Sequence, residues 1–390
     1  MTAWLLGIAV LGTATSTIFL VFVFVAALRF KTTTRRASRQ TQACPFPPMS
    51  LLKPLHGAEP RLEEYLESFF ALDYPEYEIL FCARTENDPG LKRARHVAAK
   101  HPEIPVRYVV SGQPLWPNAR CYSLFLMERE ANHELMVITD SDVKVRPSFL
   151  RDVATAFLND PAAGGLTCLY RGNAEGLGLW ALLEGLGMSV EMSAGVLVAD
   201  MLEGMRFMLG PCMAVRRPAL RAIGGFEKLG RYYADDFMLG NLLANHCRVI
   251  LSDHVIDHCI VNNSFTHNFL HQWNWMKSTR FSRPLGHLGT GLTFAMPFGL
   301  LGLLAGWISG RPLAGWMLLA WACLSRVLLC LVAGGWIVRD PDAYRFCWLY
   351  PARDLWGAIV WAASYVSRRV GWRDNQFVLE SRGTIRKVDA

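Results

Sequence analysis

The first 28 residues limit most strongly how this chain can fold. Residues 3–28 carry no charged side chain, and a helix of that length can span a bilayer, which takes about twenty apolar residues. Basic residues follow this segment directly, whereas a cleavable secretory signal carries its positive charges before a shorter apolar core. We therefore predict an uncleaved transmembrane anchor over residues 1–28 and a basic linker over residues 29–48 on the cytoplasmic side.

Two further apolar stretches point to more membrane helices near the C-terminus. Of the 390 residues 52% are hydrophobic, and the mean hydropathy is positive. Residues 288–310 are uncharged, and residues 312–338 are interrupted only by Arg326, which needs a partner inside the membrane. We predict two transmembrane helices over residues 288–338. The net charge is +7, and the basic residues that produce it lie beside apolar segments. This placement favours anionic lipid as the partner and argues against nucleic acid.

The segments that flank these helices are expected at the membrane surface. Residues 266–287 combine Trp, His, Lys and Arg, which is typical of an interfacial segment. The last apolar run, residues 355–366, is too short to cross, so we predict an interfacial helix and a basic cytoplasmic tail within residues 339–390. Three spans place that tail and the anchor's basic flank on the same side. Residues 176–210 fit either a buried helical pair or amphipathic helices against the membrane.

Residues 49–265 have the pattern of an α/β domain. Short apolar runs at residues 49–55, 78–83, 106–110 and 135–139 alternate with segments of helical spacing. This alternation predicts a doubly wound, mostly parallel sheet. The ten cysteines are scattered without a Cys-x-x-Cys pair, so neither a zinc site nor a disulfide framework is indicated.

Acidic side chains follow the predicted strands. Asp140-Ser-Asp142 comes directly after an apolar run, at a strand end where open α/β sheets bind ligands. Two such carboxylates suit Mg²⁺ or Mn²⁺ bound together with substrate phosphates, although a solvated turn is the alternative. With Asp88, Asp235 and Asp236 they would suffice to displace a nucleoside diphosphate from a sugar. For Asp235-Asp236 a helix cap is the competing interpretation.

An ordered set of motifs resembles one family over nearly the whole chain. The set comprises Pro48-x-Ser-x-Leu-Lys-Pro-Leu-x-Gly57, Leu72-Asp-Tyr-Pro-x-Tyr-Glu, Asp88-Pro, Asn118-x-Arg120, Asp140-Ser-Asp142, Ala234-Asp-Asp236 and a Trp-containing basic segment. In this order the motifs resemble the ceramide glucosyltransferase group of inverting glycosyltransferases, which includes bacterial relatives acting on hopanoid lipids. The resemblance implies a GT-A catalytic domain over residues 49–265.

The resemblance also implies a role for each acidic residue. Asp88 matches the first family aspartate, which is expected at the nucleotide. Asp140 and Asp142 match the second motif, with Asp142 expected to hold the metal at the diphosphate. Asp236 matches the expected base for the acceptor hydroxyl, and Asp235 stands beside it.

Two motif positions depart from the family pattern. Arg120 stands where the family usually has Lys, so a positive charge near the phosphates is kept. In the last motif Trp275 is kept, but His271 replaces the usual Gln or Arg and Asn274 replaces an arginine. The cation expected near the leaving diphosphate is then absent or supplied by a basic residue that follows.

Taken together, the resemblance implies a membrane glycosyltransferase. We expect it to move one sugar, glucose or N-acetylglucosamine, from a UDP-sugar to the hydroxyl of a ceramide- or hopanoid-type lipid with inversion, using Mg²⁺ or Mn²⁺. The protein is then a multi-pass protein of the inner (plasma) membrane with a cytoplasmic catalytic domain. The alternatives are a processive polysaccharide synthase, which would need more spans, and a non-catalytic membrane protein that binds nucleotide sugars.

Overall fold

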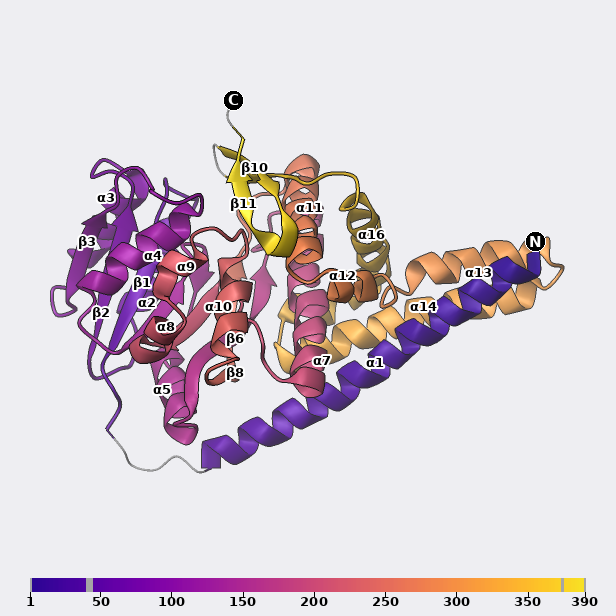
Figure 1. Cartoon of the computed structure of the whole chain (residues 1–390). Helices are drawn as coiled ribbons and strands as arrows, with labels where there is room; N and C mark the ends of the chain where they lie inside the picture. The colour runs from indigo at the N-terminus through magenta and orange to yellow at the C-terminus, as the bar shows by residue number, and fades with distance from the viewer. Residues whose placement is uncertain (1, 40–44, 373–374, 389–390) are drawn as a thin grey trace. The chain divides into compact units, whose positions relative to one another are not determined.

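A computed structural model describes residues 2–39, 45–372 and 375–388 (Figure 1), so residues 40–44 of the predicted linker lie outside the described residues. Contacts divide the chain into two compact units. The sheet unit contains Thr32–Tyr170, Leu202–Val261 and Gly383–Ala390. The helical unit contains Met1–Lys31, Arg171–Met201 and Asn262–Arg382. The linear domain boundaries given above stay a prediction.

The sheet unit is built on one sheet of eight strands in the order β3-β2-β1-β4-β7-β6-β8-β5. Its strands are β1 (Met49–Pro54), β2 (Tyr77–Ala83), β3 (Val106–Val110), β4 (Leu135–Thr139), β5 (Val143–Lys144), β6 (Ala163–Asn173), β7 (Cys212–Arg216) and β8 (Arg248–Cys259). Its helices are α2 (Leu62–Phe70), α3 (Pro89–Ala98), α4 (Ala119–Glu130), α5 (Phe149–Asn159), α8 (Arg217–Ala222), α9 (Gly225–Leu229) and α10 (Asp235–Leu243).

The strand pairing confirms the α/β fold class and makes the sheet mixed. Strands β3, β2, β1 and β4 are parallel, whereas β7 is antiparallel to both of its neighbours. Every residue of β2 and β4 is buried, as expected for strands covered on both faces. On one face, Leu124 and Met127 of α4 and Leu239 of α10 pack in a single hydrophobic cluster with side chains of the strands.

The parallel register brings the carboxyl ends of β1, β2 and β4 to the same edge of the sheet. Pro54 of β1 lies opposite Cys82 of β2, and Leu52 lies opposite Ile138 of β4. The segments that leave β2 and β4 carry the predicted acidic residues Asp88 and Asp140, respectively. Sheet register, more than any local contact, therefore decides where the candidate site lies.

The helical unit contains most of the long apolar helices. Its elements are α1 (Thr2–Arg39), α6 (Leu179–Leu186), the π-helix η1 (Gly187–Met192), α7 (Ser193–Glu203), α11 (Phe265–Ser282), α12 (Pro284–Thr290), α13 (Met296–Ile308), α14 (Pro312–Leu329), the π-helix η2 (Cys330–Ile337), α15 (Pro341–Arg345), η3 (Cys347–Leu349), α16 (Tyr350–Ala363), β9 (Arg369–Trp372), β10 (Asn375–Leu379) and η4 (Ser381–Gly383). Strands β9 and β10 pair antiparallel.

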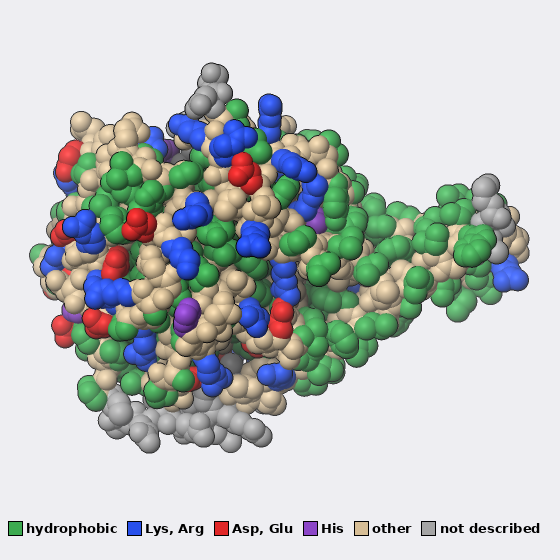
Figure 2. All heavy atoms as spheres, viewed as in Figure 1, with side chains coloured by type: hydrophobic (Ala, Val, Ile, Leu, Met, Phe, Trp, Pro, Cys, Tyr) green, Lys and Arg blue, Asp and Glu red, His purple; other side chains and the backbone are tan. Residues whose placement is uncertain are grey.

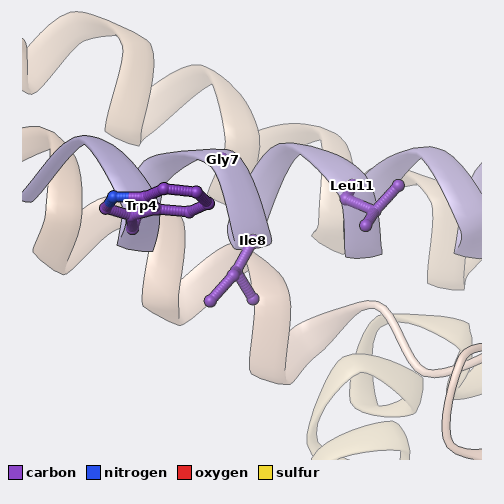
Figure 3. Close-up of a pocket in the computed structure, with 4 residues that line it drawn as sticks. All are labelled: Trp4, Gly7, Ile8 and Leu11. Atoms are coloured by element: carbon purple, nitrogen blue, oxygen red, sulfur yellow. The ribbon is translucent and has the colours of Figure 1, made fainter.

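Three helices among the described residues are long and apolar enough to cross a membrane: Trp4–Thr33, Leu179–Glu203 and Pro312–Ile337. The first and third agree with the predicted spans. In Figure 2 the visible face of α1, α13 and α14 shows hydrophobic side chains (green) along its length, interspersed with tan, and a basic side chain at its far end. At the start of α1, Trp4, Gly7, Ile8 and Leu11 line an open apolar hollow of about 400 Å³ (Figure 3). An apolar exposed surface of this kind suits contact with lipid chains.

The expected span over residues 288–310 differs in the structure. The chain there forms the end of α12 and a separate 13-residue helix, α13, which is roughly 20 Å long and shorter than the hydrocarbon core of a bilayer. The backbone N–H groups of Ala295 and Met296 at its start each donate to Asp354 Oδ2 over 2.9 Å. This carboxylate lets the helix begin in buried surroundings because it satisfies N–H groups that have no partner within the helix.

Arg326 has the partner that its place in an apolar helix requires. Its Nη1 lies 3.2 Å from Asp354 Oδ1 and donates to Thr293 O over 3.0 Å. A second pair, Arg353 with Glu191 (2.9 Å), lies in the same unit. Both arginine side chains are buried.

The remaining segments of this unit clarify two expectations. Leu179–Glu203 is one continuous helix of 25 residues rather than a pair. Most of its residues are buried, which agrees with the buried interpretation of residues 176–210 and not with amphipathic helices against the membrane. Helix α16 has 14 residues, so it is too short to cross, as its sequence suggested.

Candidate active site

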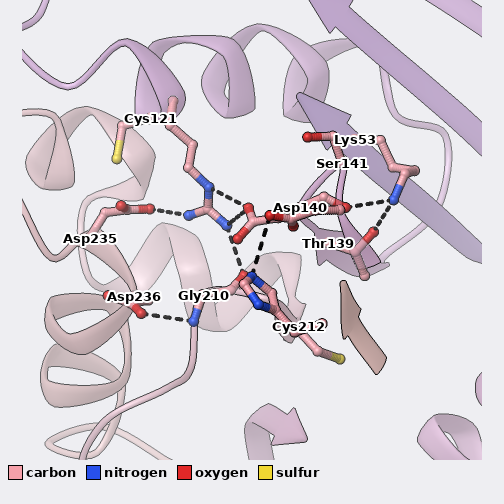
Figure 4. A network of polar contacts seen from close by, with 12 residues as sticks. Lys53, Cys121, Thr139, Asp140, Ser141, Gly210, Cys212, Asp235 and Asp236 are labelled. Carbon is pink, nitrogen blue, oxygen red and sulfur yellow. Dashed lines mark hydrogen bonds and ion pairs between the residues drawn. The ribbon is translucent and has the colours of Figure 1, made fainter. Parts of the chain in front are cut away.

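The Asp140-Ser-Asp142 segment leaves β4 as a turn held from two sides (Figure 4). Lys53 Nζ, at the end of β1, donates to Thr139 Oγ1 over 2.8 Å and to Asp140 O over 2.9 Å. Ser141 Oγ donates to the carboxylate of Glu59 over 3.1 Å. The backbone of the turn is thereby fixed at the end of β4.

Lys53 is a site residue that the sequence reasoning missed. Its side chain is fully buried, with Nζ 3.6 Å from the centre of the Phe69 ring. Burial lowers the pKa of Lys53 to about 7, although Asp140, Asp142 and Glu59 oppose that shift. The available signal was a lysine inside an otherwise apolar strand, which is costly without partners.

Arg120 joins the two acidic motifs. It lies in the first turn of α4 and donates through Nε to Asp140 Oδ1 over 3.1 Å. Its Nη1 forms an ion pair with Asp235, and its Nη2 donates to Gly210 O over 3.0 Å. Burial disfavours the charged guanidinium, but the surrounding carboxylates outweigh burial and raise the pKa of Arg120.

Asp235 and Asp236 open helix α10, yet neither is its N-cap residue. That position belongs to Ala234, which offers no side-chain bond. Asp235 is paired with Arg120 instead. Asp236 Oδ2 accepts the backbone N–H of Gly210 over 2.8 Å, and its Oδ1 accepts the following backbone N–H over 2.7 Å. The capping interpretation therefore explains little of this pair.

The carboxylates of Asp140 and Asp236 converge at Gly210. A methyl group added to Gly210 would lie 3.1 Å from Asp236 Oδ2 and 3.7 Å from Asp140 Oδ2. Burial, reinforced by the neighbouring charge of Asp235, raises the pKa of Asp236 to about 6. A carboxylate with such a pKa is better suited to accept a proton near neutral pH than an ordinary aspartate.

Asp142 faces His258, another residue that the sequence reasoning missed. His258 Nε2 lies 3.4 Å from Asp142 Oδ2, and both side chains are largely buried. Asp142 Oδ1 and His258 Nδ1 are also buried and have no hydrogen-bond partner among the residues that the structure describes. In the sequence, His258 stands alone near the end of β8, without a motif to mark it.

The electrostatics of this edge fit a divalent cation. Five carboxylates act on the two buried cations of this edge: Asp140, Asp142 and Glu59 on Lys53, and Asp140, Asp235 and Asp236 on Arg120. Among the described residues no three His, Cys, Asp or Glu side chains form a complete metal cage. Mg²⁺ and Mn²⁺ do not need one, because phosphates and water complete their coordination. Asp142 and Asp140 would hold such an ion.

The first predicted aspartate, Asp88, caps a helix at the same sheet edge. Its Oδ1 accepts the N–H of Gly90 over 2.8 Å at the start of α3, and both carboxylate oxygens lie 3.1 Å from Gly57 N. Gly57 has φ +67°, a left-handed conformation that favours glycine. Asp88 therefore organises the segment after β1, and a contact with nucleotide stays a prediction.

The last motif lies in α11 of the helical unit. His271 Nδ1 lies 2.7 Å from Glu184 Oε1, and the His271 ring centre is 4.3 Å from that of Trp275. Asn274 Nδ2 donates to Gly371 O over 3.2 Å. The expected motif residues thus belong to a polar network within this unit.

The two basic residues after Trp275 are also engaged within the helical unit. Lys277 Nζ donates to Arg369 O and lies 3.6 Å from the centre of the Trp273 ring. Burial lowers the pKa of Lys277 to about 8. Arg280 Nη1 donates to Ser364 O over 2.8 Å. Both cations therefore hold the backbone that follows α16.

A short C-terminal strand, β11 (Ile385–Lys387), lies beside the loop that precedes α10 and is joined to it by backbone hydrogen bonds. Ile385 N donates to Arg231 O over 2.9 Å, and Tyr233 N donates to Gly383 O over 3.1 Å. The C-terminal segment thus helps to hold the loop that leads to Asp235, which no feature of the sequence indicated.

Comparison with known proteins agrees with these observations. The family model for glycosyl transferase family 21 matches residues 14–385. Ceramide glucosyltransferase 1 of Caenorhabditis elegans is 27% identical over 356 residues, covering 87% of this chain and 73% of that protein. The ceramide glucosyltransferase of Komagataella phaffii is 31% identical over 135 residues, covering 33% of this chain and 26% of that protein.

Among solved structures, a mannosyltransferase from Pyrobaculum calidifontis in complex with GDP-Man and Mn²⁺ is similar with a TM-score of 0.47 and 18% identity, covering 90% of this chain and 99% of that one. The family model, in contrast, matches nearly every residue of the chain, and the sheet agrees with the α/β class predicted from the sequence. The chain belongs to glycosyl transferase family 21 and is a membrane glycosyltransferase.

Proposed function

We propose that this enzyme transfers a single sugar, glucose or N-acetylglucosamine, from a UDP-sugar to the hydroxyl of a ceramide- or hopanoid-type membrane lipid with inversion. The convergence of the Asp140 and Asp236 carboxylates at Gly210, with the pKa of Asp236 raised to about 6, carries this proposal. It provides a base beside a group of carboxylates that suits a cation and a diphosphate.

Asp236 acts as the general base. The lipid hydroxyl gives its proton to Asp236 as its oxygen bonds to the anomeric carbon, and the bond between that carbon and the diphosphate oxygen breaks. A single displacement of this kind inverts the anomeric centre. Gly210 N–H donates to Asp236 Oδ2 over 2.8 Å, which fixes the orientation of the carboxylate.

The leaving diphosphate is stabilised by the Asp140-Ser-Asp142 motif. Asp142, with Asp140, would hold Mg²⁺ or Mn²⁺, which when bound neutralises charge developing on the leaving group. Arg120 and Asp235 form the ion pair that keeps the two acidic motifs together. The family motifs imply that Asp88 binds the nucleotide and that Trp275 binds the donor.

The lipid acceptor is supported by the relatives and by the apolar helices. The matched proteins from C. elegans and K. phaffii are ceramide glucosyltransferases. An acceptor that stays in the membrane of an enzyme with membrane helices reaches the site at a high effective concentration. We place the enzyme in the inner (plasma) membrane with its catalytic unit in the cytoplasm, because the basic flank of α1 follows the positive-inside rule.

The test is sugar transfer by the full-length protein in lipid nanodiscs. UDP-glucose or UDP-N-acetylglucosamine is supplied with Mn²⁺ and either ceramide or a hopanoid polyol, and lipid products are identified by mass spectrometry. One added hexose or N-acetylhexosamine per lipid supports the proposal, while a ladder of sugars indicates a processive synthase. UDP binding without any product on either acceptor would leave the non-catalytic alternative.

A matched pair of variants assigns the base. Asp236→Asn removes the proton acceptor and keeps the shape of the side chain. Asp73→Asn makes the same change at an exposed carboxylate that pairs with Arg151. The proposal expects transfer to be lost only in the first variant, and equal activity of the two variants contradicts the role of Asp236.

A further inference from the structure

We propose that the C-terminal strand β11 positions the two acidic residues that open helix α10, and that sugar transfer requires this strand. The inference rests on the proposed function, because it concerns the placement of Asp236, the general base. It gives residues 383–385 a positioning role, although they lie far from Asp236 in the chain and belong to none of the predicted site motifs.

The start of α10 is not secured by the helix itself. Its N-cap residue, Ala234, makes no side-chain hydrogen bond, whereas a Ser, Thr, Asp or Asn in that position usually satisfies one of the first N–H groups. Asp235 and Asp236 both use side-chain oxygens to bind groups outside the helix. The position of these two carboxylates therefore depends on the loop that leads to α10, residues 230–234.

Two backbone hydrogen bonds join β11 to this loop in the pattern of paired antiparallel strands. Ile385 N donates to Arg231 O over 2.9 Å. In the other direction, Tyr233 N donates to Gly383 O over 3.1 Å. The residues between these partners form an antiparallel bridge. The side chain of Ile385 is buried, so it anchors the strand while the N–H of the same residue holds the loop.

Asn118 holds the same loop through a different backbone group. Its Nδ2 donates to Tyr232 O over 2.9 Å, the carbonyl that lies between the two groups bonded to β11. The same nitrogen lies 3.3 Å from Asp235 Oδ1. Asn118 is itself fixed as the N-cap residue of α4. The loop is therefore held by a helix start that belongs to a predicted motif and by a strand that does not.

Loss of the bonds to β11 should affect the chemical step more than nucleotide binding. A general base must lie within hydrogen-bond reach of the proton that it accepts, and a displacement of about 1 Å can cost about 100-fold in rate. Asp236 follows the loop directly, whereas Asp88, which we expect at the nucleotide, lies at the start of α3. We therefore expect a lower kcat with an unchanged affinity for UDP.

The first experiment measures the hold on the loop without any substrate. Hydrogen exchange of peptides that contain residues 231–236 is followed by mass spectrometry in full-length protein in nanodiscs. Ile385→Pro removes the N–H that bonds to Arg231 O, and Lys387→Pro introduces the same ring at an exposed residue of β11. We expect exchange about two- to tenfold faster in Ile385→Pro only, for the loss of one hydrogen bond. Equal exchange in the two variants overturns the inference.

The second experiment measures sugar transfer by the same two variants. We expect kcat of Ile385→Pro to fall about 10- to 100-fold, with KM for the UDP-sugar and Kd for UDP within about twofold of the parent values. Rates are expressed per molecule that binds UDP, so that misfolded protein does not contribute. A merely structural role would lower the fraction of protein that binds UDP and leave this kcat unchanged, which contradicts the inference.

A second pair of variants keeps the inference testable if Ile385→Pro does not fold. Gly383 and Gly176 both have φ +79°, a conformation that favours glycine. Gly383→Ala strains the residue whose carbonyl accepts Tyr233 N. Gly176→Ala introduces the same strain in the helical unit, where the added methyl group meets open space. We expect faster loop exchange and a lower kcat only in Gly383→Ala, and equal values in the two variants overturn the role of β11.

Failure of this inference is distinguishable from failure of the proposed function. If the parent transfers sugar and a variant with faster loop exchange keeps the same kcat, the function stands and the role of β11 is rejected. If the parent transfers no sugar to either acceptor, the proposed function is rejected. Hydrogen exchange in Ile385→Pro then decides by itself whether β11 holds the loop in front of Asp235 and Asp236.

Discussion

Arg120 in the sheet unit and Arg326 in the helical unit are both buried arginines, but their surroundings differ in charge. Arg326 pairs with one carboxylate, Asp354, whose second oxygen accepts two backbone N–H groups. Arg120 interacts with three carboxylates, those of Asp140, Asp235 and Asp236. The first arrangement is electrically balanced, whereas the second retains excess negative charge.

This difference indicates which buried ion pair stabilises the fold and which belongs to a site. Asp354 uses both oxygens within the protein and secures the start of α13, and Arg326 Nε is the atom of this pair without a hydrogen-bond partner among the described residues. In the sheet unit, by contrast, the Asp142 Oδ1 atom has no hydrogen-bond partner among the described residues, and a cation or substrate would complete its surroundings. Four experiments can break or sharpen this comparison, starting with the largest expected effect.

Asp236→Asn should abolish most of the transfer activity. Loss of a general base typically costs about 10²- to 10⁴-fold in rate, and an amide keeps the acceptor geometry toward Gly210 N–H. The measurement is kcat for sugar transfer in nanodiscs, together with Tm. If a fall in Tm accounts for the lost activity, Asp236 stabilises the fold, as the Arg326–Asp354 pair does, and is not the base.

Arg326→Met should mainly affect stability. It leaves Asp354 buried without its counter-ion, which typically costs about 3–5 kcal/mol. The double variant Arg326→Met/Asp354→Asn should recover part of that loss, because no buried charge is then left uncompensated. Thermal unfolding in detergent tests both variants. Equal stability of the single variant and the parent would show that the Arg326 pair does not secure the helical unit.

Arg120→Lys should lower activity while the protein stays folded. Lysine keeps the positive charge but cannot reach Asp140, Asp235 and Gly210 O at once as the guanidinium does. Loss of one hydrogen bond to a charged group costs about 1.5–3 kcal/mol, which corresponds to roughly a 10- to 150-fold loss in kcat/KM. Full activity of the lysine variant would show that charge alone suffices there.

The pH dependence should show the smallest effect. Because burial raises the pKa of Asp236 to about 6, this group is deprotonated and able to accept a proton above that pH. As pH falls below about 6, kcat/KM should fall about tenfold per unit. A rate profile on the folded enzyme tests this; a limb near the ordinary aspartate range would contradict the burial of the base.

Much of the fold and of the site could be predicted from the sequence, for identifiable reasons. The anchor and the Pro312–Ile337 helix were predictable because bilayer length and absence of charge are local properties. The resemblance was carried by ordered motifs, and the family match over residues 14–385 confirmed it. The roles assigned to the individual site residues, including Asp88 and Trp275, stay predictions.

The misses share one physical cause, which is that they depend on partners distant in the chain. The 288–310 span was wrong as a single helix because Asp354, about sixty residues later, caps a shorter helix there. Lys53, although part of a quoted motif, and His258 were given no site role, because the function of a buried lysine or histidine depends on the groups that face it. The hydrogen bond from Ile385 N to Arg231 O likewise joins residues that are far apart in the chain.

The sequence alone determined that this chain has membrane helices, an α/β unit with acidic strand ends, and a family relationship. These properties depend on composition, periodicity and motif order along the chain. Only the tertiary structure decided that Asp140 and Asp236 meet at Gly210, that Arg120 lies between acidic motifs, and that His258 faces Asp142. Strand register and loop packing set those distances, and neither is encoded in any single segment.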